Sequence, residues 1–306
     1  MPDEAVHEEH FFGWISSKPD FRDYLFAAVP AVLAALPPLV DLSVPEVPAP
    51  FSPAWSQGRL GSCGPHTAGA DIVFAALRQQ NLPNVSMPSR LFIYYITRML
   101  QGTINSDSGV SNRELLKALA RHGWCDEALW PYVIGNFTVR PPDSCWQQAS
   151  KRKLTQYLSV PQNLEQMLGC LAGGDPFIFG FSVYESINNP EVGATGDVPM
   201  PKRTERQIGG HDVLVCAYNL ETRRFKFKNS WGSAWGLGGF GTIPFEYATN
   251  PQLAGDFWTV KHAALPAPEP TPVPPVPPDP PAPPVPVGKR IITVTGGTIE
   301  VDGRPV

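Results

Sequence analysis

The stretch FKFKNSWGSAWGLGGFGTIPFEY, residues 225–247, indicates two short strands joined by a glycine-rich turn. Its first part alternates aromatic and basic residues, which is typical of a strand with one buried face. This strand ends in Asn229-Ser230-Trp231-Gly232, and a second tryptophan, Trp235, follows before the apolar segment GFGTIPF, residues 239–245. An amide and two large rings therefore stand close together where a predicted strand ends.

The preceding predicted strand, HDVLVCAYN, begins with His211 directly after Gly209-Gly210. Backbone without side chains at these glycines would line a cleft. Adjacent antiparallel strands would bring Asn229 beside His211, where its amide would hold the imidazole in one tautomer. Trp231 would then shield that hydrogen bond from water.

Upstream, SQGRLGSCGPHT, residues 56–67, places Cys63 among small residues just before an apolar, helix-like run. A thiol attacks a carbonyl as thiolate, which a helix N-terminus and a nearby base favour. Gln57 supplies an N–H₂ donor that, with the backbone N–H of Cys63, would form an oxyanion hole. His66 lies on the predicted helix itself, so we interpret it as a packing residue rather than a second base.

These segments together resemble the papain-like cysteine peptidases, and in particular their bacterial branch. The resemblance rests on Gln57 with GSCG, on GGHDVLVCAY and on residues 225–247, and it covers roughly residues 40–262. It implies an α+β, two-domain fold: a helical domain and an antiparallel, β-barrel-like domain, with the active-site cleft between them. It also implies a hydrolase that cleaves peptide bonds and needs neither a metal nor an organic cofactor.

The resemblance assigns a role to each matching position. Cys63 would be the nucleophile that forms a thioester acyl-enzyme, His211 the general base and acid, Asn229 the group that orients the histidine, and Gln57 the oxyanion donor. Substrate-binding positions follow in the same way, with backbone beside the substrate strand and rings on the leaving-group side: Gly109, Gly210, Trp231 and Trp235.

Two departures from the family pattern stand out. Gly64-Pro65-His66 follows the cysteine where the family usually has Trp-Ala-Phe, which would open one wall of the cleft. Asp212 follows His211 where a small apolar residue is usual. Its carboxylate would either raise the pKa of His211 or point away, since successive strand residues face opposite sides.

The composition of the 306-residue chain changes along its length and indicates four segments. We expect an N-terminal arm or short pro-segment over 1–54, a peptidase domain over 55–262 (helical over about 55–155, β over about 156–262), a Pro-rich linker over 263–288 and a β-hairpin-like tail over 289–306. In the arm, Trp14, Phe21 and Tyr24 are the predicted anchors by which it would cross the cleft or brace the β domain.

Other function classes have little support. The formal net charge is −4 and no long basic run occurs, so we expect no nucleic-acid partner. The apolar stretch over 25–40 is too short and too rich in proline to span a membrane. An acidic N-terminus is not a secretory signal, so the sequence favours a cytoplasmic protein or one exported by a non-standard route. Cys125 and Cys145 are either a disulfide or two reduced thiols.

Three functional readings follow. The first is a peptidase acting on peptides or proteins. The second is a non-catalytic papain-fold binding module, tethered to a protein partner through the Pro-rich tail and its terminal hairpin. The third is acyl transfer to an acceptor other than water, or an exopeptidase with one end of its cleft blocked.

Overall fold

The computed structural model describes residues 11–43, 54–80, 85–264, 292–295, 298–301 and 304–305. The chain divides into two compact units, 1–266 and 267–306. The helices of the first unit are α1 (Pro30–Leu33), α2 (Cys63–Gln80), α3 (Arg90–Gln101), α4 (Asn112–His122), α5 (Asp143–Ala149), α6 (Leu164–Ala172), α7 (Pro190–Thr195) and α8 (Phe245–Thr249), with 3₁₀ turns over Ile134–Asn136 and Glu185–Asn188. Its strands are β1 (Leu39–Asp41), β2 (Lys153–Ser159), β3 (Phe177–Tyr184), β4 (Gln207–Asn219), β5 (Arg224–Lys228), β6 (Phe240–Pro244) and β7 (Ala254–Ala264).

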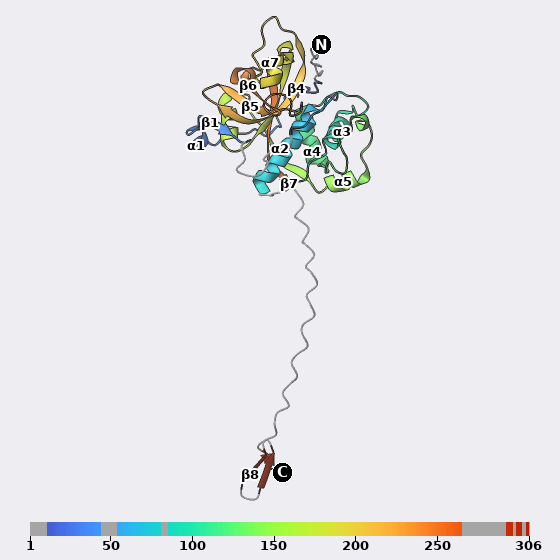
Figure 1. Ribbon diagram of the computed structural model, residues 1–306, viewed down its shortest axis with the longest axis vertical. Coiled ribbons are helices and arrows are strands. Elements are labelled where there is room, and N and C mark those ends of the chain that lie inside the picture. Colours follow the sequence, from blue (N-terminus) through green and yellow to red (C-terminus); the bar gives the residue numbers. More distant parts are fainter. Residues whose placement is uncertain are drawn as a thin grey trace, which may run out of the picture. The chain divides into compact units, whose positions relative to one another are not determined.

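The first half of this unit is helical, as the sequence predicts. Helix α3 begins where the Ser89 hydroxyl accepts a hydrogen bond from the backbone N–H of Phe92 (3.1 Å), and it ends at Gly102 in the left-handed conformation (φ 73°). Helix α2 carries Cys63 as its first residue. It lies between α3 to α5 on one side and β4 to β6 on the other (Figure 1), so its N-terminus opens where the two parts meet.

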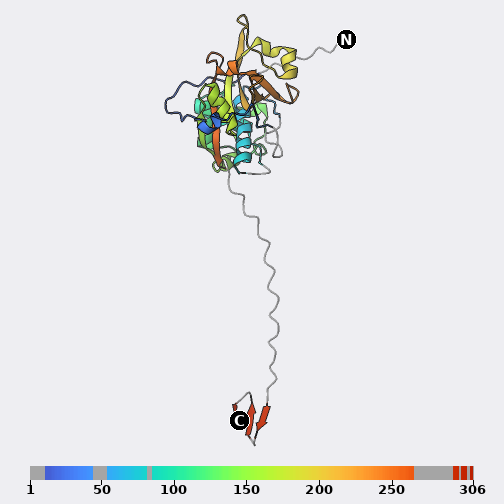
Figure 2. The same ribbon diagram turned by 90° about the vertical axis from the view of Figure 1, so that its left-hand side faces the viewer.

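The second half is an antiparallel sheet in the order β2-β7-β3-β4-β5-β6, with β1 added beside β4. After a quarter turn of the view, α2 stands upright in light blue below the yellow and orange strands (Figure 2). The register pairs Phe181 of β3 with His211 of β4, and Gly180 with Asp212. Because partners in register share a face, His211 and Asp212 point to opposite sides of the sheet.

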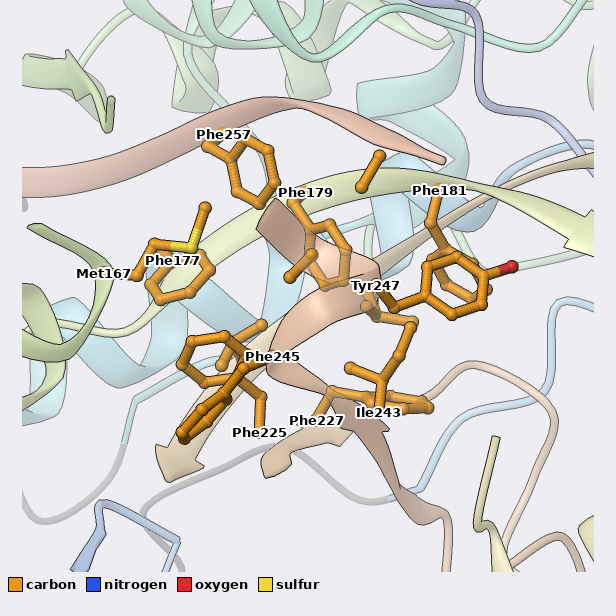
Figure 3. Close-up of a cluster of buried hydrophobic side chains, with 14 of the residues drawn as sticks. Met167, Phe177, Phe179, Phe181, Phe225, Phe227, Ile243, Phe245, Tyr247 and Phe257 are labelled. Atoms are coloured by element: carbon orange, nitrogen blue, oxygen red, sulfur yellow. The ribbon is translucent and has the colours of Figure 1, made fainter. Parts of the chain in front are cut away.

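An apolar interior fills the space enclosed by the strands. Alternate residues of β3 point into it, and their rings meet rings from β5, β7 and α8, as Figure 3 shows. The rings of Phe179 and Phe257 stack at 5.1 Å, and those of Phe225 and Phe245 lie 4.6 Å apart. The opposite face of the sheet packs on α2 through Ile178, Leu214 and Trp258. The sheet is thus held on both faces, which fixes β3 and β4 beneath the cleft.

The second unit contributes β8 (Ile292–Thr295), β9 (Thr298–Val301) and β10 (Arg304–Pro305). These strands pair antiparallel in the order β10-β9-β8, so the tail has three strands where the sequence indicated a hairpin of two. Ala263 and Ala264, which the sequence analysis assigned to the Pro-rich linker, are the last residues of β7; the rest of the predicted linker and Gly296–Gly297 lie outside the described residues. Within the described ranges no helix is long and apolar enough to cross a membrane.

Candidate active site

Cys63 is fully buried at the N-terminus of α2. Burial and the charge of Asp212 raise the pKa of its thiol, while hydrogen bonds from the backbone N–H groups of Asp212, Gly13 and Gly64 lower it. Burial and the Asp212 charge outweigh these hydrogen bonds, so the net shift of the Cys63 pKa is upward. The sulfur is therefore held as a neutral thiol, although donors that would stabilise a thiolate already surround it.

His211 is bonded to Asn229 across strands β4 and β5, with 2.7 Å between Nε2 of the ring and Oδ1 of the amide. The backbone N–H of Ser230 also donates to that Oδ1, at 2.8 Å, which fixes the oxygen toward the ring. Nε2 therefore carries the proton, and the lone pair of the imidazole is on Nδ1. Trp231 stacks on the imidazole at 4.5 Å between ring centroids, and Trp235 packs edge-on against Trp231 at 5.2 Å. Both rings shield the His211–Asn229 bond, Trp231 directly and Trp235 through Trp231.

Gln57 is buried, and the segment that carries Asn229 and Ser230 holds one side of its amide. Its Oε1 accepts from the Ser230 hydroxyl at 2.6 Å, and its Nε2 donates to the carbonyl of Leu60 at 2.9 Å. The second Nε2 hydrogen donates to the carbonyl of Phe11 at 3.0 Å. A carbonyl from the N-terminal arm thus occupies the donor that the sequence assigned to an oxyanion.

The arm continues across the cleft as an extended segment. The carbonyl of Gly13 accepts from the N–H of Val110 at 2.7 Å, and the N–H of Ile15 donates to the carbonyl of Val110 at 3.0 Å. On the other side, the N–H of Trp14 donates to the carbonyl of Gly210 at 3.0 Å. Residues 13–15 therefore bridge the helical part and the sheet directly over the buried thiol.

Gly109 acts through its lack of a side chain. Its φ is +71°, and a Cβ here would lie 2.2 Å from the carbonyl oxygen of Gly13. Its own N–H is bonded to the Tyr94 hydroxyl at 3.1 Å. The backbone groups that pair with the arm thus belong to Val110, one residue beyond the predicted position.

The sequence profile of papain family cysteine proteases matches residues 50–254. The chain belongs to this family. It is 36% identical over 275 residues to an uncharacterized peptidase C1-like protein of Acanthamoeba polyphaga mimivirus, a match that covers 83% of this chain and 88% of the viral protein. It is accordingly a cysteine peptidase, a hydrolase.

Solved structures agree with this assignment. Xylellain, a cysteine protease from the bacterium Xylella fastidiosa, is 38% identical and superimposes with a TM-score of 0.75, covering 82% of this chain and 95% of that one. A procathepsin B from Trypanosoma congolense shares the fold at 16% identity and a TM-score of 0.66, covering 82% of this chain and 86% of that one. The α+β papain-like fold and the bacterial resemblance are thereby confirmed.

The two departures from the family pattern meet in space in this peptidase. Asp212 is fully buried and turned away from His211, and its Oδ1 accepts from the Asn112 side chain at 2.8 Å. A Cβ on Gly64 would lie 3.2 Å from Asp212 Oδ2. Burial, and next the charge of Asp256, raise the pKa of Asp212 well above its usual range. The Asp212 carboxyl thus lies in the space beside Gly64, which has no side chain. The sequence analysis treated Asp212 and Gly64 as two separate departures from the family pattern.

His66 packs rather than acts as a base. Its Nδ1 lies 2.8 Å from the carbonyl of Ser62 and its Nε2 3.2 Å from Arg90 Nη1. Burial, followed by the charge of Arg90, lowers the pKa of His66 to about 3. Cys125 and Cys145 are both buried free thiols in this structure.

Of the three predicted anchors of the arm, two are wrong. Phe21 is 100% exposed and Tyr24 is 80% exposed, so neither holds the arm in place. Trp14 does anchor it, and Phe12, which the sequence analysis missed, approaches the rings of His211 and Trp231 edge-on, each at 6.4 Å. Aromatic content alone did not separate the rings that face the cleft from those that face solvent.

Proposed function

We propose that this peptidase hydrolyses peptide bonds through a thioester on Cys63. His211 Nδ1 would take the thiol proton as the sulfur attacks the scissile carbonyl, and it would then deliver that proton to the leaving amine. Water, deprotonated by the same imidazole, would release the acyl group and restore the thiol. The observation that carries the proposal is the 2.7 Å bond from His211 to Asn229 in a site that also holds Cys63 and Gln57.

Gln57 is suited to stabilise the tetrahedral oxyanion. One Nε2 hydrogen and the Gln57 Oε1 are already committed to Leu60 and Ser230, which leaves the amide rigidly oriented. The other hydrogen is aimed at the position where the Phe11 carbonyl oxygen now lies. Preorganised donors of this kind contribute most because they need no reorientation during the reaction; the loss of one typically costs about 2.7–4 kcal/mol of barrier.

The position of the N-terminal arm supports an inactive state of the enzyme in which the active site is covered. The backbone N–H of Gly13, in the arm, is hydrogen-bonded to the Cys63 sulfur. The arm also uses the Gln57 donor and shares in the complete burial of Cys63. Catalysis would therefore need residues 11–15 to leave the cleft, and a substrate would take over their backbone partners.

The test compares full-length variants on an internally quenched peptide. Gly13→Ala, which should displace the arm, is expected to show turnover, and adding Cys63→Ser to the same chain is expected to abolish it while circular dichroism stays unchanged. A point substitution is preferred to deletion of residues 1–45, because β1 and the buried Phe26 belong to the folded body. Persistent turnover in the Cys63→Ser chain would refute the nucleophile.

The same experiment addresses the rival readings. If Gly13→Ala exposes Cys63 to alkylation but no peptide is cleaved, the binding-module reading gains and hydrolysis is refuted. Product analysis on peptides with blocked and unblocked termini separates an endopeptidase from an exopeptidase. Added amine nucleophiles in the assay reveal transfer to an acceptor other than water.

A further inference from the structure

The two oxyanion donors proposed above, the Gln57 side chain and the backbone N–H of Cys63, are joined by residues 58–62, which we call the oxyanion loop. The loop turns sharply where it begins, because Gly58 has a φ of +54°. Two donors stabilise one oxyanion only when both point to the same place. The distance between the two ends of this loop is therefore critical for the reaction.

The Tyr132 hydroxyl contacts both ends of the oxyanion loop. It donates to the carbonyl of Gln57 at 2.9 Å, and its oxygen lies 2.5 Å from the hydroxyl of Ser62, the residue before Cys63. Since the single phenol hydrogen is used on the carbonyl, the Ser62 hydroxyl is the donor in the second bond. Burial raises the pKa of Tyr132 above its usual range, so the phenol keeps its hydrogen at neutral pH.

The rest of Tyr132 is held firmly from the side away from the loop. Its backbone N–H donates to Glu127 Oε1 at 2.9 Å, and Arg90 Nη2 of α3 donates to the same oxygen at 2.6 Å. The Arg90 guanidinium also lies over the Tyr132 ring, 4.6 Å from its centroid. His66 packs edge-on against this ring at 4.9 Å. The hydroxyl is thus fixed in place by a network that does not include the substrate.

Tyr218 makes a bond of the same kind elsewhere in the fold. Its hydroxyl donates to the carbonyl of Pro37 at 2.9 Å, and its side chain is buried in β4. It lies seven residues beyond His211 in the same strand, which is about 23 Å at about 3.3 Å per residue. Loss of this hydroxyl therefore removes a comparable bond far from the oxyanion loop.

We propose that Tyr132 is a positioning residue of the oxyanion hole. Its hydroxyl links the carbonyl of Gln57 to the hydroxyl of Ser62, and this link sets the separation of the two donors that a tetrahedral oxyanion needs. The proposal rests on the peptidase function proposed above and adds a residue to it. Because Tyr132 acts through Gln57 and Cys63, it should matter only for steps in which charge builds on the atom bound in the hole.

The first test compares two reactions of the same thiol. Attack on a peptide carbonyl creates an oxyanion, whereas alkylation by iodoacetamide displaces iodide and creates none. On the Gly13→Ala chain, adding Tyr132→Phe should lower kcat at least tenfold with KM within threefold, which is the pattern of an interaction made in the transition state. Labelling of Cys63 by iodoacetamide should stay within twofold. An equal loss in both reactions would overturn the proposal, because it would mean that the thiol itself is disturbed.

Two further variants control for stability. Tyr218→Phe on the same chain should lower Tm as much as Tyr132→Phe does and leave kcat within twofold. Ser62→Ala removes one of the two bonds and leaves Tyr132 intact, so it should lower kcat by less than Tyr132→Phe. If Tyr218→Phe lowers kcat as much as Tyr132→Phe, activity follows general stability and the proposal is overturned.

A second test does not need turnover. A peptide nitrile adds the Cys63 thiol across its C≡N bond: sulfur bonds to carbon, the thiol proton goes to nitrogen, and charge develops on nitrogen in the oxyanion hole. On the Gly13→Ala chain the nitrile should protect Cys63 from iodoacetamide. Tyr132→Phe should raise the concentration needed at least fivefold, and Tyr218→Phe should not.

The two proposals can fail separately. If nitrile protection depends on Tyr132 but no peptide is cleaved, the positioning role stands and the peptidase proposal fails. If peptides are cleaved and Tyr132→Phe changes kcat no more than Tyr218→Phe does, the positioning proposal fails alone.

Discussion

Gly13 is the residue on which closure of the cleft should depend most. An alanine Cβ there would lie 1.9 Å from the carbonyl oxygen of Gly61, whereas a relaxed carbon–oxygen contact needs about 3.3 Å. Gly61 cannot yield easily, because its N–H is held by both oxygens of the Asp107 carboxylate at 3.0 Å. Alanine at position 13 should therefore push the arm out by more than about 1 Å.

The energetic effect can be worked from the bonds that hold the segment. A shift of this size breaks the hydrogen bonds of the Gly13 carbonyl, the Trp14 N–H and the Ile15 N–H, which have lengths of 2.7, 3.0 and 3.0 Å. At about 1 kcal/mol net for each bond, closure loses about 3 kcal/mol. The ratio of open to closed molecules then rises about 150-fold.

The assay is initial-rate hydrolysis of a quenched peptide by the full-length chain, well below KM. Gly13→Ala should raise the rate at least tenfold, up to the point where nearly all molecules are open. Ser16→Ala, a change of similar size at an exposed position of the same arm, is the control and should leave the rate within twofold. An unchanged rate for Gly13→Ala, with an unchanged melting temperature, would refute the inhibitory role of the arm.

Further predictions concern the groups around the nucleophile. Asn229→Ala should lower kcat by about tenfold or more with little change in Tm, because the imidazole loses its orienting acceptor; unchanged kcat would remove Asn229 from the mechanism. Burial, and after it the charge of an ionised Asp212, raises the pKa of the Cys63 thiol, so Asp212→Asn should shift the alkylation profile of Cys63 to lower pH over the range in which Asp212 is ionised; a shift to higher pH would contradict this sign. The pKa of His66 is lowered to about 3, so the unfolded chain binds a proton that the native chain does not between about pH 6.5 and 3. As the pH falls through this range, the free energy of unfolding should decrease by about 1.4 kcal/mol per pH unit. His66→Gln should therefore reduce the drop in Tm measured from about pH 6.5 to about pH 4.

Much of the catalytic arrangement could be predicted from short-range pattern. The short turn between β4 and β5 favours antiparallel pairing, and the register that puts Leu214 opposite Lys228 brings Asn229, the residue after β5, close to His211. Cys63 at a helix start follows from Gly-Ser-Cys-Gly-Pro ahead of an apolar run. These features depend on neighbours along the chain, which a sequence displays directly.

The rest depends on contacts between distant segments. The ring of Trp14 lies against Gly180, Gly210 and Gly255, each of which taken alone is an ordinary strand glycine. Likewise Gly64 and Asp212 are separated by more than half the peptidase domain, and only packing shows that one makes room for the other. Phe21 and Tyr24 failed as anchors for the same reason: an aromatic side chain in an irregular arm has no periodicity to say which way it points.

Whether Cys63 and His211 form an activated pair is tested by iodoacetamide labelling of the Gly13→Ala chain from pH 4 to 9, with the modified cysteine mapped by mass spectrometry. Cys63 should be labelled fast well below pH 7, and this labelling should be lost when His211→Ala is added, because an imidazolium beside the opened site stabilises the thiolate. Labelling of Cys63 only near pH 8.5, at the rate of an ordinary thiol and unaffected by His211→Ala, would contradict an activated Cys63–His211 pair.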